Sequence, residues 1–145
     1  MYNLINHMYI LIQNTMNNYF KYLPVSEHDT NWGLYVLNAG YNRIGPASRY
    51  PSTGHPADHQ FSWDKGRILE EFQLIYITRG KGIFESKSCS QTPIQEGTII
   101  LLFPHEWHRF KPDDNTGWDE FWIGFNGNII QNIALNKFIS PHQSI

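Results

Sequence analysis

The sequence has little that could cross-link the chain or hold a metal through sulfur. Its 145 residues include a single cysteine, Cys89. One cysteine excludes an internal disulfide and a zinc site built from several thiolates. We interpret Cys89 as a buried or idle thiol in preference to a catalytic nucleophile.

Long apolar runs are also missing. Near the start of the chain, Met8–Ile12 is an apolar run between His7 and Gln13, and no lysine or arginine precedes Lys21. A membrane-spanning helix needs about 20 apolar residues, and a secretory signal begins with positive charge. We therefore expect a cytoplasmic protein that makes no contact with a membrane.

Charge is sparse and nearly balanced. Lysine and arginine number 11 against 13 aspartate and glutamate residues, which gives a formal net charge of −2. DNA-binding surfaces concentrate basic residues, so we do not expect this chain alone to bind nucleic acid tightly. Hydrophobic residues make up 41% of the chain, as in a globular protein, and the length favours one domain.

Aromatic residues are the abundant class. The chain has 5 Trp, 8 Tyr and 9 Phe, which together make up 15% of its residues. Most of these rings should lie in a hydrophobic core. A surplus of rings close to polar groups would suit a pocket for a small molecule.

Residues 1–31 are interpreted as an N-terminal extension. Leu4, Met8 and Ile12 share a helical spacing, so a short helix is one alternative. The other alternative is a loose extension that ends near Met16, because few caps or charges would fix a helix there.

Short strands and turns follow from residue 32. An apolar run over residues 34–37 predicts a strand that ends at residues 38–40. Glycine and proline then punctuate residues 41–66, which predicts loops. Alternation over residues 72–78 predicts a strand, and Gly80 and Gly82 predict a hairpin turn behind it.

The strand pattern continues to residue 126. Residues 83–86 and 98–103 are predicted to be extended, with a turn over residues 92–97 between them. Alternation over residues 118–125 places Trp118, Glu120 and Trp122 on one side of a strand. From residue 128, a helical spacing of apolar residues predicts a helix that ends before Pro141. The sequence therefore predicts an all-β sandwich or barrel over residues 32–126, followed by a helix within residues 127–145.

Four blocks of sequence resemble a known family: residues 72–82, 97–104, 107–110 and 118–125. A strand ending in Gly-x-Gly, a glycine-led strand ending in proline, a His-plus-aromatic step and a Trp-rich strand follow one another in this order. This resembles the amino-terminal effector-binding domain of AraC-type transcription regulators. The resemblance implies an all-β double-stranded β-helix, which is the jelly-roll barrel of cupins.

The resemblance also implies a function and its partners. The domain would sense a small-molecule effector, and the helix after Gly127 would lead toward dimerisation helices and a helix-turn-helix domain. This chain shows no sequence pattern for those parts, so we expect contact with DNA only through a C-terminal region outside it. A homodimer remains an open alternative for its assembly.

Candidate ligand-binding residues come from the same resemblance. In sugar-sensing members, the positions that match Phe110, Glu120 and Trp122 are an aromatic residue, a histidine and a tryptophan that line the sugar pocket. Glu120 departs from this pattern. Arg67 falls near a family arginine that contacts ligand, with Lys65 as the alternative. A purely structural role in the core is the competing interpretation of Trp122 and Glu120.

Two other functions were compared with the sensor. A metal-dependent cupin enzyme would use His108, but no histidine lies between Phe61 and Pro104 to complete a metal site. His55 and His59 are separated by Pro56, which argues against a helix that would align them. We therefore expect no metal, no cofactor and no catalysis, and assign His108 a structural or ligand-binding role. A stand-alone carbohydrate-binding cupin is the second alternative.

Overall fold

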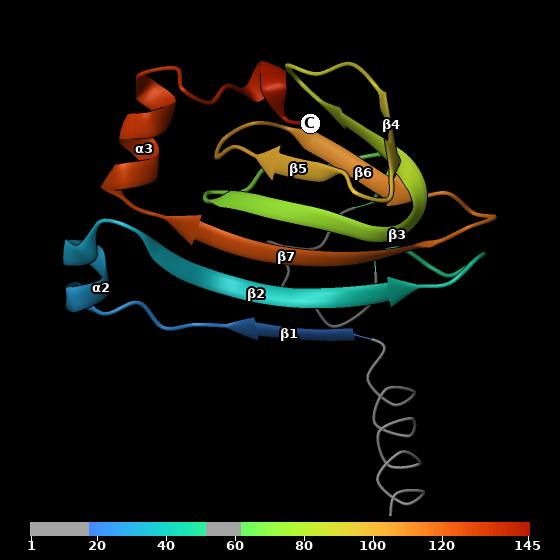
Figure 1. Ribbon diagram of the computed structural model, residues 1–145, viewed down its shortest axis with the longest axis horizontal. Helices are drawn as coiled ribbons and strands as arrows, with labels where there is room; N and C mark the ends of the chain where they lie inside the picture. The colour runs from blue at the N-terminus through green and yellow to red at the C-terminus, as the bar shows by residue number, and fades with distance from the viewer. Residues whose placement is uncertain (1–17, 52–61) are drawn as a thin grey trace, which may run out of the picture.

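The computed structural model describes residues 18–51 and 62–145. The helix considered around Leu4, Met8 and Ile12 lies outside these residues, as do His55 and His59. The described residues form antiparallel strands with short helices at the ends of the structure (Figure 1). The elements are β1 (Asn18–Tyr22), α2 (Glu27–Trp32), β2 (Tyr35–Ile44), β3 (Phe72–Ser86), β4 (Thr92–Gln95), β5 (Ile99–Leu102), β6 (His108–Pro112), β7 (Trp118–Asn126), α3 (Asn128–Leu135) and the 3₁₀ helix η1 (Pro141–Gln143).

The strands build two sheets that share β3. The first half of β3 pairs with β7 and β5, and β2 and β1 extend that sheet beyond β7. The second half of β3 pairs with β4 and β6. Figure 1 shows β3 curving from one group of strands to the other. The expected all-β jelly-roll barrel is confirmed, and so is the helix that follows it.

The glycines of β3 make a bend, and the predicted hairpin is wrong. The strand runs without a break through Gly80 and Gly82, and its register with β7 shifts between Ile77 and Arg79. Gly80 has a φ of 87°, and a Cβ there would collide with the carbonyl oxygen of Gly117. Left-handed backbone and close approach therefore allow β3 to leave one sheet and enter the other.

Strand β2 is also longer than predicted. It runs through residues 38–40, where the sequence pattern predicts an end, and loops begin only after Ile44. Gly40 is required inside the strand because a Cβ there would collide with the ring of Trp122. Residues 92–97, predicted as a turn, form β4 before the turn begins. Tertiary packing overrides the local turn signals at both places.

The sheet begins before the expected boundary at residue 32. Strand β1 pairs with β2 along its whole length. Helix α2 follows, with a capping box between Ser26 and Asp29 and a left-handed Gly33 at its end. The described part of residues 1–31 therefore supplies an edge strand and a helix.

The core lies between the two sheets. The predicted alternation of β3 is confirmed, because Gln73, Ile75 and Ile77 are buried while Tyr76 is exposed. The main apolar cluster joins side chains from both sheets, and it comprises Ile44, Leu69, Ile75, Ile77, Phe84, Ile94, Ile100, Leu102, Phe110 and Trp118.

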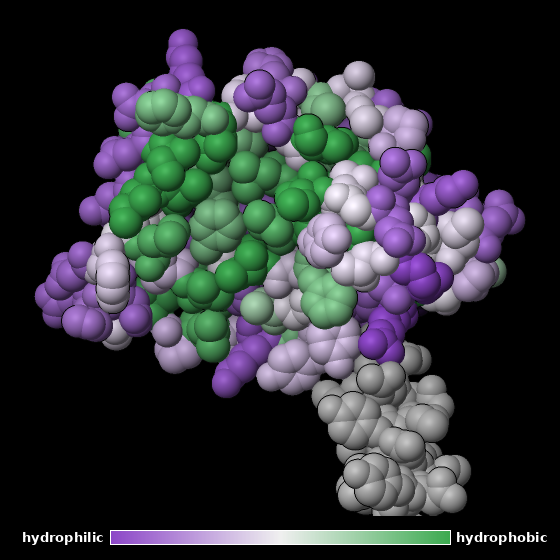
Figure 2. Space-filling model, in the orientation of Figure 1, coloured by the Kyte–Doolittle hydropathy of each residue, from purple (hydrophilic) through white to green (hydrophobic). Residues whose placement is uncertain are grey.

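The outer face of the larger sheet is apolar. Figure 2 shows a continuous hydrophobic area across this side of the molecule. Adjacent positions on the five strands contribute Tyr19, Tyr41, Phe121, Tyr76 and Ile99, four of which are exposed. No helix among the described residues is long and apolar enough to cross a membrane.

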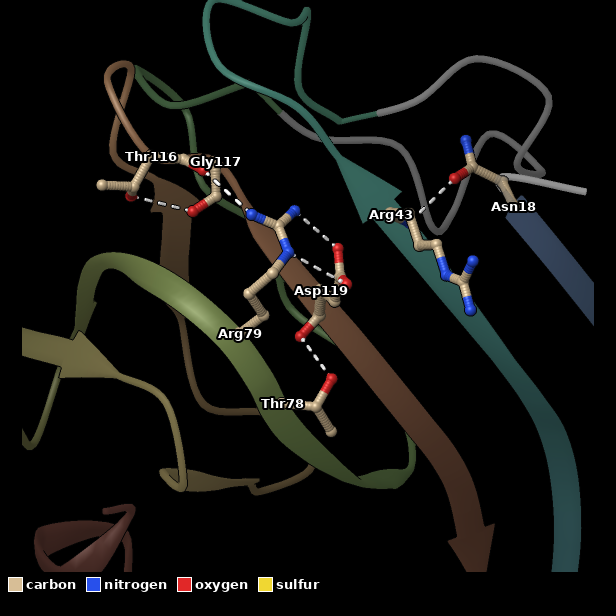
Figure 3. Close-up of polar contacts among 7 residues, drawn as sticks. All are labelled: Asn18, Arg43, Thr78, Arg79, Thr116, Gly117 and Asp119. Atoms are coloured by element: carbon tan, nitrogen blue, oxygen red, sulfur yellow. Dashed lines mark hydrogen bonds and ion pairs between the residues drawn. The ribbon is translucent and has the colours of Figure 1, made fainter. Parts of the chain in front are cut away.

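A polar cluster closes one end of this face. Arg79 of β3 forms an ion pair with Asp119 of β7, with 2.8 Å between Nη2 and Oδ1 (Figure 3). Arg79 also donates to the carbonyl oxygen of Thr116, and the hydroxyl of Thr78 donates to that of Asp119. These contacts tie β3 to β7 beside the bend and hold the register that places Glu120 inside the barrel.

The bend can be tested by comparing two glycines with the same backbone conformation. Gly97 has a φ of 88°, as Gly80 does within one degree, but a Cβ on Gly97 meets no atom within 4 Å. Gly97→Ala should cost about 1 kcal/mol of unfolding free energy from its φ alone. Gly80→Ala should cost about 3 kcal/mol because a collision is added. Urea denaturation measures both, and equal losses would contradict the close approach at Gly80.

Candidate ligand-binding site

A small cavity lies inside the barrel between its two sheets. Its volume is about 40 Å³, which has room for a few water molecules. Four of the five predicted site residues line it, and the fifth, His108, lies behind Arg67 and Phe110. The lining residues are Tyr22, Asn42, Tyr50, Pro51, Arg67, Gln73, Ile75, Phe110, Glu120 and Trp122.

Strand register positions one wall of the cavity. The alternation of β7 turns Glu120 and Trp122 inward, as predicted from sequence. Their neighbours on β2 are Asn42 and Gly40 respectively. Asn42 brings an amide to the carboxylate, and Gly40 leaves space for the indole ring. The sheet therefore presents an acid, an amide and an aromatic face side by side.

Glu120 is the buried acid of the site. Its side chain accepts from Nδ2 of Asn42 at 2.8 Å and from the hydroxyl of Tyr50 at 3.1 Å. Only 4% of Glu120 is exposed. Burial raises the pKa of Glu120, while the bonds from Asn42 and Tyr50 and the charge of Arg67 oppose that rise. Burial, followed by the charge of Glu120, raises the pKa of Tyr50 well above its usual value, so its phenol remains a donor.

Arg67 lies on the opposite side of the cavity. A two-way backbone bridge with His108 holds it at the start of β6, with both N···O distances at 3.0 Å. Its Nη2 donates to Oε1 of Gln73 at 3.0 Å, and its guanidinium lies 5.4 Å from the centre of the Phe110 ring. The alternative candidate, Lys65, is exposed. Arg67 is therefore the basic residue of this cavity.

His108 supports Arg67 and Phe110 from behind. Its Nε2 accepts from Nε of Arg67 at 3.1 Å, so Nδ1 carries the proton and donates to the carbonyl oxygen of Glu106 at 3.0 Å. Its ring stacks on Phe110. Burial and the nearby charge of Arg67 lower the pKa of His108 to about 3, so the ring is neutral.

This arrangement leaves His108 poorly suited to bind a metal. A metal-binding imidazole offers the lone pair of a ring nitrogen, and the lone pair on Nε2 accepts the bond from Arg67. Within residues 18–51 and 62–145, no three His, Cys, Asp or Glu side chains are placed to hold a metal ion. His105 is exposed and lies 3.4 Å from Glu70.

Sequence reasoning missed three polar residues of the cavity. Gln73 is a polar residue on the inward side of an otherwise apolar strand, which is a signal that could have found it. Asn42 becomes recognisable once β2 is known to pair with β7. Tyr50 lies in a segment rich in glycine and proline, and only the folded chain brings it to Glu120.

Comparison with known proteins can now be added. Residues 46–145 match the family described as AraC-like ligand binding domain. The chain belongs to this family. The raffinose operon transcriptional regulatory protein RafR of Pediococcus pentosaceus is 26% identical over 69 residues, which are 48% of this chain and 25% of that protein. The match therefore spans about a quarter of the length of RafR.

Several solved structures with cupin titles are similar. A predicted oxalate decarboxylase from Thermotoga maritima is 19% identical, with 75% of this chain and 80% of that chain covered and a TM-score of 0.44. The cupin domain of Cnp3 from Schizosaccharomyces pombe is 8% identical, with coverage of 83% and 72% and a TM-score of 0.45. A Cupin 2 conserved barrel domain protein from Salinispora arenicola is 15% identical, with coverage of 83% and 85% and a TM-score of 0.44.

The buried neutral state of His108 predicts a pH dependence of stability. The unfolded chain takes up a proton at His108 near pH 6.5, whereas the folded protein does so only near pH 3. Lowering the pH through this window therefore favours the unfolded state. From pH 7 to pH 5, the wild-type protein should lose about 2 kcal/mol more unfolding free energy than His108→Gln.

Urea denaturation at both pH values measures this difference. The comparison with His108→Gln cancels the contribution of the other titrating groups. Parallel losses in the two proteins would contradict a neutral, buried His108.

Proposed function

We propose that this chain is the effector-sensing domain of a transcription regulator and that its effector is a small neutral carbohydrate. The chemistry of the cavity is the observation that carries the proposal. Glu120 and Asn42 could bond hydroxyl groups from one side, while Arg67 and Gln73 could do so from the other. Trp122 and Phe110 offer ring faces for the C–H surface of a sugar.

The charges of the cavity favour a neutral ligand. One guanidinium, Arg67, and one carboxylate, Glu120, line the same space. An anionic ligand would meet repulsion from Glu120, and a cationic ligand would meet repulsion from Arg67. A polyhydroxyl compound can donate to Glu120 and accept from Arg67 at the same time. The name of RafR, a regulator of a raffinose operon, supports a sugar from a separate direction.

The proposed role is binding without catalysis. Membership of a ligand-binding family supports this role, and so does the use of both ring nitrogens of His108 within the protein. Contact with DNA would come from another part of a longer regulator, which would act in the cytoplasm. Ligand in the barrel would favour one arrangement of sensor and DNA-binding parts by about 1–3 kcal/mol.

The proposal is tested by substituting the buried acid. Raffinose, melibiose, D-galactose and L-arabinose are titrated against the protein, with tryptophan fluorescence and melting temperature as readouts. We expect at least one sugar to change the fluorescence, because Trp122 lines the cavity, and to raise the melting temperature by mass action. Glu120→Gln should weaken that sugar roughly tenfold or more, because a hydrogen bond to a charged acceptor is lost.

Glu70→Gln is the matched control. It removes the same charge from a side chain that is 81% exposed and lies outside the cavity lining. Sugar affinity should stay unchanged in this variant. An equal effect of the two substitutions, or no response to any of the sugars, would argue against carbohydrate binding at this site.

A further inference from the structure

Tyr50 occupies the cavity much as a ligand would. Its hydroxyl lies 3.1 Å from Oε2 and 3.4 Å from Oε1 of Glu120. Its ring lies 5.8 Å from that of Trp118, in an edge-to-face arrangement, and 6.2 Å from that of Phe110. One side chain therefore combines a hydroxyl on the buried acid with a ring among aromatic neighbours.

The space left beside Tyr50 is too small for a sugar. The cavity measures about 40 Å³, enough for water but far less than a hexose. A sugar can therefore bind only if a lining group moves away.

Most of the lining is fixed by strand pairing. Asn42, Glu120 and Trp122 lie in paired strands of the larger sheet, and Phe110 pairs with β3 in the smaller one. Arg67 is held by its two backbone bonds to His108. Tyr50 lies in residues 45–51, which follow the end of β2 and form no strand or helix. Tyr50, with its neighbour Pro51, is thus the lining group with the greatest freedom to leave.

We propose that Tyr50 is an internal guest of the binding site, and that ligand must displace it from Glu120. The identity of the displacing ligand as a sugar rests on the proposed function above. The guest role of Tyr50 itself rests on its contacts and on the size of the cavity.

Displacement of Tyr50 would carry ligand binding to the surface. The backbone N–H of Ala47 donates to the carbonyl oxygen of Asp114 at 2.8 Å, in the turn between β6 and β7. Ala47 has a φ of 54°, a left-handed conformation that costs a non-glycine residue about 1 kcal/mol. Outward movement of Tyr50 would pull on this contact and could relax that backbone. Residues 45–51 would then report the occupied state.

A first experiment tests the guest role without any sugar. Tyr50→Ala removes the phenol, and p-cresol, which has the structure of the missing side chain, is added back. Apolar cavities made in this way bind small aromatic molecules. We expect p-cresol to raise the melting temperature of Tyr50→Ala and to leave that of the wild type unchanged or lower.

Tyr76→Ala is the control for unspecific effects of p-cresol. Tyr76 is 42% exposed on the outer sheet face, so its removal opens no interior site. Equal responses of the two variants, or no response of folded Tyr50→Ala, would overturn the proposal. If Tyr50→Ala does not fold alone, p-cresol present during refolding must restore the near-ultraviolet circular dichroism of the native protein. Absence of that rescue would also overturn it.

A second experiment measures competition with the four sugars named above. Tyr50→Phe keeps the ring but removes the hydroxyl that competes for Glu120. A displaced guest predicts that this variant binds sugar roughly tenfold more tightly than the wild type. A Tyr50 that contacts bound sugar predicts weaker binding, and that result would overturn the proposal. If p-cresol binds Tyr50→Ala but no sugar binds any variant, the carbohydrate assignment fails and the guest role stands.

Discussion

The burial of Glu120 is the constraint on which the site depends. A carboxylate removed from water is costly unless hydrogen bonds and an opposite charge compensate for it. Asn42 and Tyr50 supply the bonds, and Arg67 supplies the charge across the cavity. These partners come from β2, from the segment after β2, and from the segment before β3. One buried acid therefore ties together parts of the chain that are far apart in sequence.

The basic side of the cavity is organised in the same way. Arg67 is desolvated, and it is held by Gln73, by the neutral imidazole of His108 and by the ring of Phe110. His108 can accept from Arg67 only while it is unprotonated, so its low pKa and its structural role have one cause. The result is a polar site with opposite charges on its two sides and aromatic rings between them. Such a site suits a ligand that is itself neutral and rich in hydroxyl groups.

The rigid and the adaptable parts of the site have different origins. Strand pairing fixes Asn42, Phe110, Glu120 and Trp122, since each belongs to a ladder of backbone hydrogen bonds. Tyr50 reaches the same acid from an irregular segment. A fixed receptor wall and a side chain that can be exchanged for ligand would together provide the two states that a sensor requires. The exchange couples the interior to the turn contacted by Ala47.

The sequence by itself determined which residues of each strand share a side. Alternation in residues 118–125 places Glu120 and Trp122 together, and the blocks around it identify the fold and four of the cavity residues. Two glycines are compatible with a hairpin or with a bend, and only pairing of β3 with β7, β5, β4 and β6 decides for the bend. The meeting of Tyr50 and Asn42 with Glu120 was likewise decided by tertiary structure. Local patterns report which way a side chain points, whereas its partners depend on strands and loops that lie far away in the chain.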